Sequence, residues 1–256
     1  MVGRDADLFY KKETIDIGEP LLRAENYSRA DVVRQVSFEV RRGEIFGIGG
    51  MVGSGRTELV NLLFGVDKRD SGELYLEGRK ITPDSPGAAV GSGICMITED
   101  RKGSGLFGVR PVSENVAIVK NEGGGLFINL RREAQQVLEK VHQLSIQLAT
   151  IAQDVESLSG GNQQKVILSR WLMTGADVFI FDEPTKGVDI GAKEEIYRTM
   201  IELARHGKGI VMISSDMPEL LSMSDRIGVM RAGQMVTVVA AQEASEERLI
   251  KEYLGF

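Results

Sequence analysis

One glycine-rich stretch constrains this chain more than any other part of its sequence. Residues 50–57 read Gly-Met-Val-Gly-Ser-Gly-Arg-Thr and lie between the apolar run 44–48 and the apolar-patterned segment 58–64. A strand, glycines at this spacing and then a helix form the layout of a loop that cradles a polyphosphate. The glycines let successive backbone N–H groups turn inward, and the helix adds its positive end. The chain is therefore expected to be built on a phosphate-binding P-loop.

One residue of the loop departs from the usual pattern. Arg56 stands where the pattern asks for lysine, whereas Thr57 matches it and is expected to bring its hydroxyl to Mg²⁺. Arginine keeps the positive charge, but its guanidinium is a planar fork and does not simply replace a compact ammonium. The residues predicted to contact the phosphates are Gly50, Gly53, Ser54, Gly55, Arg56, Thr57 and Glu58.

Length, charge and cysteine content limit the number of domains and the kinds of partner that this chain can have. A chain of 256 residues is long for one domain, so we expect one α/β unit with room for an inserted subdomain. The formal net charge of −6, without a block of Lys or Arg, argues against a nucleic-acid partner. The single cysteine, Cys95, predicts a reduced thiol in a buried strand. No apolar run is long enough to span a membrane, so work at a membrane would depend on a partner.

The chain begins with a polar segment and continues with short strand patterns. Residues 1–19 lack a clear period and predict a linker or tail, which leaves 20–256 as the folded domain. Alternating runs predict strands at 21–25 and 35–40. Together with the run 72–78 and the apolar segment 94–97, we expect them to form an accessory sheet beside the P-loop.

The second half of the chain alternates helices with strands. Glycine-rich loops and helical patterns predict a mainly helical insertion at about 103–171. Buried strands are predicted at 178–181 and 209–213, with a helix at about 192–205 between them. This alternation predicts an α/β fold with a mostly parallel sheet and a ligand at the carboxyl ends of its strands.

Two carboxylates follow one of the buried strands. Asp182 ends an apolar run and is expected to hold Mg²⁺ beside the P-loop. Glu183 comes next and is expected to orient or deprotonate the attacking water. A strand that ends in Asp-Glu is as often only a solvated strand exit, so the functional interpretation depends on the P-loop upstream.

A second glycine-containing helix start lies about twenty residues earlier. Ser159 is predicted to cap a helix, and the glycines after it would expose further backbone N–H groups to an anion. Two phosphate clamps make sense if they serve different nucleotides, each held between this chain and a partner. The residues predicted to act there are Ser159, Gly160, Gly161, Asn162 and Gln163.

These motifs, in this order, resemble the nucleotide-binding domain of an ABC transporter. The P-loop, the Leu-Ser-Gly-Gly-Asn-Gln signature at 158–163 and the segment 182–189 cover nearly the whole chain after residue 19. Within that family the chain is similar to the second half of the duplicated ATPases of bacterial monosaccharide importers. The resemblance implies ATP and Mg²⁺ as cofactors and ATP hydrolysis coupled to sugar import. It also implies a location at the cytoplasmic face of the membrane.

The same resemblance implies the partners. They are a second nucleotide-binding half, expected earlier in the same native chain, and integral membrane permease subunits. A periplasmic sugar-binding protein would supply the sugar to the permease. The sequence leaves open a non-transport ABC ATPase or a nucleotide-gated regulatory module.

Three positions depart from the family pattern. Arg56 replaces the P-loop lysine, and Glu99 stands where a glutamine usually reaches Mg²⁺ and the membrane partner. Asp216 replaces a histidine expected at the γ-phosphate, where a carboxylate 4 Å away would be repelled by about 4 kcal/mol at an effective dielectric of 20. These departures predict a P-loop site that binds ATP but hydrolyses it poorly, with an intact signature that completes the partner's site. The alternative is that both sites turn over.

Several other features carry less weight. Tyr27 is the only aromatic residue near the position where one should stack on adenine. The glycine pattern at 103–108 matches a dinucleotide-binding motif but does not directly follow a strand. His142 and His206 have no partners spaced for a metal, and residues 243–254 predict an amphipathic helix packed on the domain edge.

Overall fold

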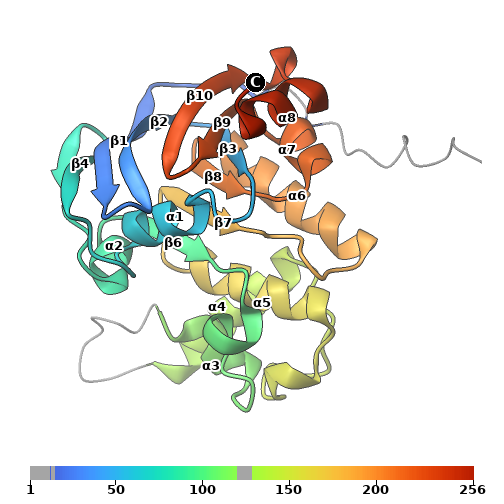
Figure 1. Ribbon diagram of the computed structural model, residues 1–256. Helices are drawn as coiled ribbons and strands as arrows, with labels where there is room; N and C mark the ends of the chain where they lie inside the picture. The colour runs from blue at the N-terminus through green and yellow to red at the C-terminus, as the bar shows by residue number, and fades with distance from the viewer. Residues whose placement is uncertain (1–11, 13–14, 120–128) are drawn as a thin grey trace, which may run out of the picture.

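The computed structural model describes residues 12, 15–119 and 129–256, which form two sheets and a separate group of helices (Figure 1). The larger sheet has six strands in the order β10-β9-β3-β8-β7-β6. All of its strand pairs are parallel except β9 with β10. The strands are β3 Ile45–Gly50, β6 Ile94–Ile97, β7 Val178–Asp182, β8 Gly209–Ile213, β9 Arg226–Arg231 and β10 Gln234–Ala240.

The second sheet is antiparallel and comes mostly from the start of the domain. Its strand order is β2-β1-β4-β5. One face packs on the core, which gives the alternation of buried and exposed residues along β2. The strands are β1 Pro20–Arg29, β2 Val33–Arg41, β4 Ser71–Leu76 and β5 Arg79–Ile81. The predicted α/β fold, with a mostly parallel sheet and an N-terminal antiparallel sheet, is confirmed.

The expected place of segment 94–97 was wrong. Its residues form β6, which pairs in parallel with β7 in the larger sheet rather than with the antiparallel strands. All four residues are buried. An unbroken apolar run is typical of a strand covered on both faces, whereas an antiparallel strand with one solvated face alternates.

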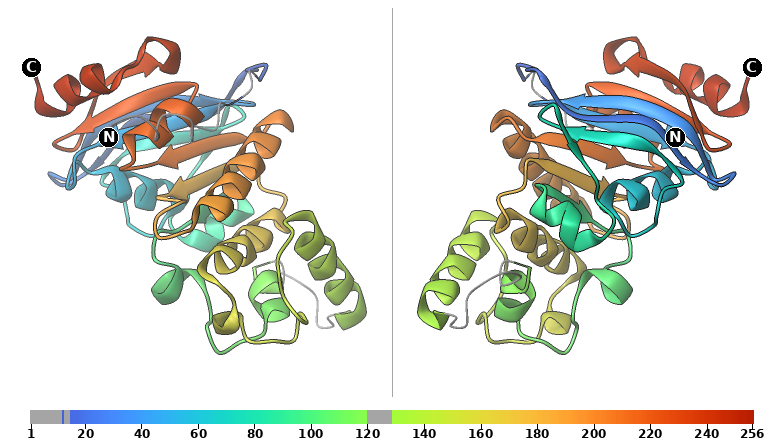
Figure 2. Two further views of the ribbon diagram at one scale, coloured as in Figure 1. Left: turned by 90° about the vertical axis from the view of Figure 1, so that its right-hand side faces the viewer. Right: turned by 90° about the vertical axis from the view of Figure 1, so that its left-hand side faces the viewer.

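Helices cover both faces of the larger sheet. Helix α1 lies on the side of the antiparallel sheet, and α6 covers the opposite side (Figures 1 and 2). A separate group, α3, α4 and α5, lies beyond the β6 edge of this sheet (Figures 1 and 2). The helices are α1 Arg56–Phe64, α2 Pro86–Gly91, α3 Val112–Ala117, α4 Leu130–Gln143, α5 Gly160–Leu172, α6 Ile190–Arg205, α7 Met217–Met223 and α8 Glu246–Leu254, with short helical turns at Arg101–Gly105, Val155–Ser157 and Ala241–Glu243.

The described part of the predicted linker contacts the domain. Lys12 forms an ion pair with Asp225, and its side chain is 6% exposed. The Gly18 amide donates to the carbonyl of Arg42 at 2.8 Å. Residues 12 and 15–19 therefore follow the surface of the domain, and the rest of 1–19 lies outside the described residues.

Parallel pairing brings the predicted motifs to one edge of the sheet. Ile213 at the end of β8 pairs with Ile48 of β3 on one side and with Asp182 of β7 on the other. The chain leaves these strands toward the same side, where ligands bind in open parallel sheets. The P-loop, Asp182-Glu183 and the segment after β8 consequently meet there.

Candidate functional site

The P-loop connects β3 to α1 at the centre of the sheet. All six residues of β3 are buried between β8 and β9. Helix α1 begins at Arg56, and its N-cap Gly55 is left-handed (φ 97°) with no side-chain hydrogen bond to the first turn. The first N–H groups of a helix have no partner within it, so this end is open to an anion.

Two glycines of the loop have a left-handed backbone for different reasons. A Cβ on Gly55 would lie 2.6 Å from the carbonyl oxygen of Val32 and 3.2 Å from the Cα of Gly233. Gly53 is also left-handed (φ 78°), but a Cβ there would meet nothing within 4 Å. Gly55 therefore lets the loop pack against its surroundings, whereas Gly53 supplies only the turn.

The side chain of Arg56 is tied to the neighbouring strand ends. Arg56 is 8% exposed. Its Nη1 donates to the carbonyl of Ser214 at 2.8 Å, and its Nη2 lies 3.9 Å from Oε1 of Glu183. The cation is thus held inside the domain by two groups at the carboxyl ends of β8 and β7.

Glu183 is fixed in the same place. Its Oε2 accepts hydrogen bonds from the backbone N–H and the hydroxyl of Ser215, at 3.0 and 2.9 Å. Its backbone is left-handed (φ 49°), which is rare for a residue with a side chain and is often found at functional sites. The carboxylate expected to act on water is therefore oriented by Ser215 and Arg56.

Asp182 has the most unusual environment of the site. It is 3% exposed, and its buried Oδ1 has no hydrogen-bond partner. Burial first, and then the negative charges of Glu183 and Glu99, raise the pKa of Asp182 from 3.8 to about 6. A buried carboxylate oxygen without a partner fits a divalent cation, which would neutralise it.

The other two predicted Mg²⁺ ligands are exposed. Thr57 lies in the first turn of α1, and Glu99 follows β6 by two residues. Glu99 accepts a hydrogen bond from Lys186 at 2.6 Å in an exposed ion pair. Among the described residues, no group of three or more His, Cys, Asp or Glu could hold a metal.

Asp216 has a structural partner at each carboxylate oxygen. Its Oδ1 accepts from the N–H of Glu219 at 3.2 Å and so caps α7. Its Oδ2 lies 3.6 Å from Nζ of Lys193. The negative charge that was expected to repel a phosphate is therefore partly balanced by a lysine of α6.

The signature turn confirms the predicted N-cap. The hydroxyl of Ser159 accepts a hydrogen bond from the backbone N–H of Asn162, which caps α5. The side-chain Nδ2 of Asn162 also donates to this hydroxyl at 3.0 Å, and its Oδ1 accepts from Gln147 N–H at 2.9 Å. Unlike α1, helix α5 thus begins with its own side-chain cap.

The remaining signature residues differ in exposure. Gln163 is 9% exposed, and its Nε2 donates to the carbonyl of Leu158 at 3.1 Å. A Cβ on Gly161 would lie 2.6 Å from the Cβ of Ala192, so this glycine allows α5 to approach α6 closely. Gly160 is only partly buried at the first position of α5.

Tyr27 cannot stack on adenine in this structure. It is fully buried in the antiparallel sheet, with 0% of its surface exposed. The register of β1 shifts between Ala24 and Tyr27, so both side chains are buried although they are three residues apart. The only aromatic candidate near that position is thereby excluded.

Sequence reasoning missed a buried acid beside the site. Glu219 is 3% exposed and accepts a hydrogen bond from Thr185 Oγ1 at 2.8 Å, which links α7 to the segment after β7. Burial raises the pKa of Glu219. The spacing of Asp216 and Glu219 is that of a capping box, and it could have drawn attention to this pair.

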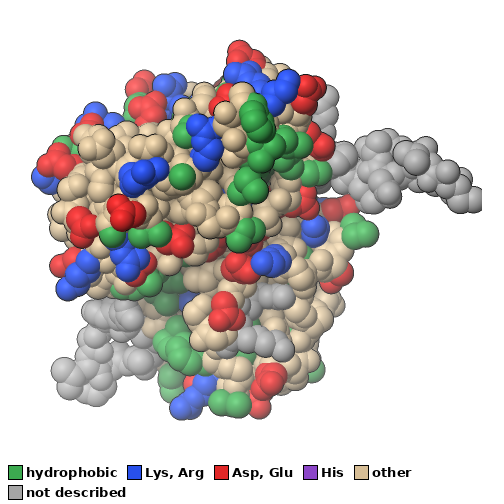
Figure 3. Space-filling view, in the orientation of Figure 1, with side chains coloured by type: hydrophobic (Ala, Val, Ile, Leu, Met, Phe, Trp, Pro, Cys, Tyr) green, Lys and Arg blue, Asp and Glu red, His purple; other side chains and the backbone are tan. Residues whose placement is uncertain are grey.

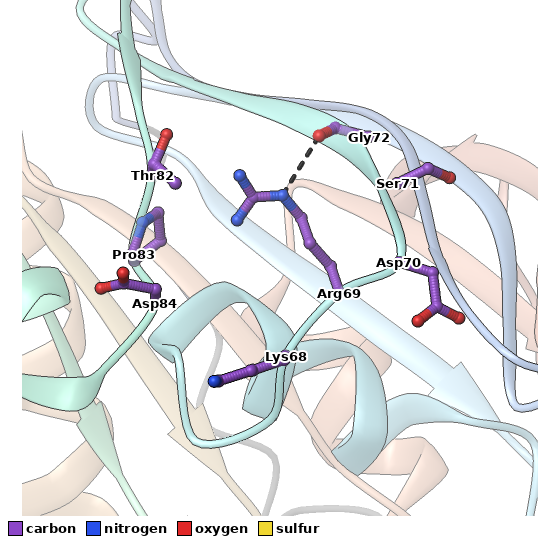
Figure 4. A pocket seen from close by; sticks show the side chains of 8 residues that line it. All are labelled: Lys68, Arg69, Asp70, Ser71, Gly72, Thr82, Pro83 and Asp84. Atoms are coloured by element: carbon purple, nitrogen blue, oxygen red, sulfur yellow. Dashed lines mark hydrogen bonds between the residues drawn. The ribbon is translucent and has the colours of Figure 1, made fainter.

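Two hollows lie away from the P-loop. One of about 380 Å³ lies beside the antiparallel sheet, where Arg69 reaches across toward Thr82 and its Nε donates to the carbonyl of Gly72 at 3.2 Å (Figure 4). The other, of about 310 Å³, is lined by Phe107, Arg110, Glu114, Asn115 and Ile118. Neither contains a residue predicted to bind nucleotide.

The charge distribution on the surface and the character of the helices agree with what the composition indicated. Acidic and basic side chains alternate over the face shown in Figure 3 without a continuous basic area. Among the described residues, no helix has both the length and the apolar character needed to cross a membrane.

The fold and the site together define a P-loop nucleotide-binding domain. The ABC transporter family pattern matches residues 33–186. The ribose import ATP-binding protein RbsA 3 of Rubrobacter xylanophilus is 47% identical over 98% of this chain and 50% of its own length. The galactose/methyl galactoside import ATP-binding protein MglA of Clostridium tetani is 41% identical over 98% of this chain and 51% of its own length.

A solved structure agrees with these relatives. An ATP-binding cassette of an ABC transporter in its ADP conformation superposes with a TM-score of 0.77 at 25% identity, over 93% of this chain and 100% of that one. The chain belongs to the ABC transporter family, as its motifs indicated. It spans about half the length of the curated relatives it matches.

Proposed function

We propose that this chain is the C-terminal ATP-binding half of an ATPase that energises monosaccharide import. Its relatives at 47% and 41% identity are named as ribose and galactose/methyl galactoside import ATP-binding proteins. The matched half-length supports a second nucleotide-binding half as partner. The permease subunits and a periplasmic sugar-binding protein would complete the importer, with this chain at the cytoplasmic face of the membrane.

The P-loop site would hold ATP with Mg²⁺. The open N-terminus of α1 and the amides of residues 53–57 would bind the phosphates, and Asp182 with Thr57 would hold the cation. Bound Mg²⁺ would supply charge neutralisation at the phosphates. Glu99 would assist as an exposed carboxylate once its ion pair with Lys186 opens.

The same site would hydrolyse ATP slowly. The observation that carries this proposal is the position of Arg56, whose guanidinium is bound to Ser214 and faces Glu183 instead of standing free in the loop. To act as a base toward water, Glu183 must leave its hydrogen bonds with Ser215 and its ion pair with Arg56. Asp216 adds a further negative charge nearby. Binding is therefore favoured over turnover.

The signature turn would act on a nucleotide held by the partner half. Ser159, Gly160 and Asn162 are the accessible residues of this turn, since Gly161 and Gln163 are buried. An approaching phosphate would have to share or replace the hydroxyl that caps α5. Gln163 would support the shape of the turn rather than touch the nucleotide.

ATPase assays on the chain alone and with its partner half test this proposal. The chain alone should bind a fluorescent ATP analogue with Mg²⁺ but turn it over far more slowly than the complete two-half protein. In the complete two-half protein, Glu183→Gln should change the rate little, because this site contributes little of the total turnover. Fast hydrolysis by the chain alone, abolished by Glu183→Gln, would overturn the assignment of a weak site.

Transport itself needs a separate experiment. The complete protein should co-purify with a hydrophobic permease. Vesicles that contain both proteins, with the ATPase facing the lumen, should accumulate sugar only when ATP is enclosed in the lumen. A soluble complex with no permease would instead favour the regulatory alternative.

A further inference from the structure

Two helices rest directly on the backbone of the strand that leads into the P-loop. Gly47 and Gly49 of β3 face the same side, because alternate residues of a strand do. A Cβ on Gly47 would lie 2.2 Å from Oγ of Ser224, just after α7. A Cβ on Gly49 would lie 2.2 Å from the hydroxyl oxygen of Tyr253 in α8. The tyrosine hydroxyl thus occupies the space that a side chain at Gly49 would fill.

Three contacts hold α8 in position and so keep the side chain of Tyr253 against β3. Its Leu249 is fully buried, and Ser245 caps its first turn by accepting from Arg248 N–H at 3.2 Å. Arg231 of β9 donates through Nη1 to the carbonyl of Glu252, next to the tyrosine, at 2.7 Å. The end of the last helix is therefore anchored to a strand beside β3.

The surroundings of the hydroxyl tie it to the loop. Burial raises the pKa of Tyr253, while the charge of Arg56 and the nearby backbone of Gly50 lower it in part. Gly50 is the last residue of β3 and the first of the P-loop motif. The hydroxyl thus lies where the strand becomes the loop, within the field of the arginine that replaces the usual lysine.

We propose that Tyr253 is a positioning residue that fixes the start of the P-loop and thereby sets its affinity for the polyphosphate of ATP. The proposal rests on the proposed function, because it concerns the same nucleotide site. A loop whose first residue is already held loses less conformational freedom on binding, so its affinity is higher. The tyrosine touches the strand and loop backbone, not the nucleotide.

Removing only the hydroxyl tests the proposal. Tyr253→Phe should weaken binding of a fluorescent methylanthraniloyl derivative of ATP by about 3- to 10-fold, the effect expected for the loss of one buried polar contact. The matched control is Tyr75→Phe, which removes a hydroxyl bonded to Glu73 in the antiparallel sheet and should leave the affinity unchanged. A Tyr253→Phe affinity within two-fold of the unmodified chain would overturn the proposal, whatever happens to the melting temperature.

A second experiment does not depend on nucleotide. Gly49→Ala should lower the melting temperature, because its Cβ meets the hydroxyl, and adding Tyr253→Phe should recover part of that loss. The recovery is partial because Cδ1 of Leu220 would still lie 2.9 Å from the new Cβ. Strictly additive losses would show that the contact is absent and would overturn the proposal.

The two experiments separate the possible failures. If the unmodified chain does not bind the ATP derivative, the proposed function fails, and the role of Tyr253 in nucleotide affinity fails with it. If the unmodified chain binds and Tyr253→Phe binds equally well, only the role of Tyr253 fails. A purely structural tyrosine would lower the melting temperature without changing the affinity.

Discussion

The two helix starts that carry the nucleotide motifs are built in opposite ways. Helix α1 begins after Gly55, which offers no side chain to the first N–H groups. Helix α5 begins after Ser159, whose hydroxyl already accepts from Asn162. A helix end with open donors can take an anion at once, whereas a capped end must exchange one partner for another. The P-loop is thus prepared for phosphate, and the signature turn is stable without it.

The N-termini of α1 and α5 also differ in the charge of the groups around them. Near α1, Asp182, Glu183 and Arg56 are all nearly buried and face one another. Near α5, the hydrogen bonds of the turn join neutral groups such as Asn162 and Gln147. Binding of a nucleotide would therefore rearrange charge at the first start and only hydrogen bonds at the second.

The largest effect is expected from adding one methyl group to the open start. Gly55→Ala should lower the free energy of unfolding by about 3 kcal/mol, from the left-handed backbone and the clash with Val32 and Gly233. It should also abolish binding of the fluorescent ATP analogue. Urea unfolding and a binding titration measure the two effects.

Gly53→Ala provides the matched control. Its backbone is also left-handed, but a Cβ there meets nothing within 4 Å, so it should cost about 1 kcal/mol. Equal losses for the two variants would mean that the packing around Gly55 contributes nothing.

The next largest effect concerns the unpartnered carboxylate. Asp182→Asn should stabilise the nucleotide-free chain at neutral pH by about 1–3 kcal/mol, because it removes a buried charge. It should also remove the difference between ATP affinities measured with Mg²⁺ and with EDTA. A variant that keeps the Mg²⁺ dependence would show that the cation is held elsewhere.

The pH dependence of stability should report the same carboxyl. Its pKa in the folded chain, about 6, lies above the ordinary 3.8, so the folded state binds this proton more tightly than the unfolded state. Its contribution is fully present below about pH 4 and is lost as the pH rises through about 6, in total about 3 kcal/mol. Urea unfolding of the unmodified chain and of Asp182→Asn across this window should differ in slope with this sign.

Much of the fold could be predicted because the relevant patterns are local. The glycine spacing at 50–57, the apolar run before Asp182 and the cap at Ser159 each depend on a few adjacent residues. The place of β6 could not be predicted in the same way, because its partner β7 lies some 80 residues later in the chain. The unbroken apolar run 94–97 is typical of a strand covered on both faces, but it does not show which strand pairs with it.

The ion pairs at the site also depend on contacts between segments that are far apart in the sequence. Lys186 reaches Glu99, and Lys193 reaches Asp216, only because parallel strands bring separate loops to one edge. The sequence identified both acids as departures from the family pattern but gave no reason to pair them with lysines. Tyr253 was missed for a similar reason, since its contact with Gly49 joins the last helix to the central strand.

A smaller effect is expected at the capped start. Ser159→Ala should lower the free energy of unfolding by about 1 kcal/mol, because α5 loses its cap. ATP binding to the chain's own P-loop should not change, while ATPase activity of the complete two-half protein should fall. Ser85→Ala removes the equivalent cap of α2 and should cost similar stability without lowering that activity. A loss of P-loop affinity in Ser159→Ala would contradict the separation of the two starts.

A similarly small change in stability is expected for Arg56→Lys, although it alters the chemistry of the open start. Lysine keeps the charge but loses the fork that binds the Ser214 carbonyl, so the free energy of unfolding should fall by only about 1 kcal/mol. Hydrolysis by the chain alone should rise several-fold, because Glu183 is released and a compact ammonium can follow the phosphates. Arg34→Lys, which removes a guanidinium bound to the Ala232 carbonyl at 3.0 Å through Nε, is the control and should leave the rate unchanged. If Arg56→Lys does not raise the rate, the slow step lies with Asp216 or with the missing partner half, and the difference between the two helix starts does not by itself explain weak turnover.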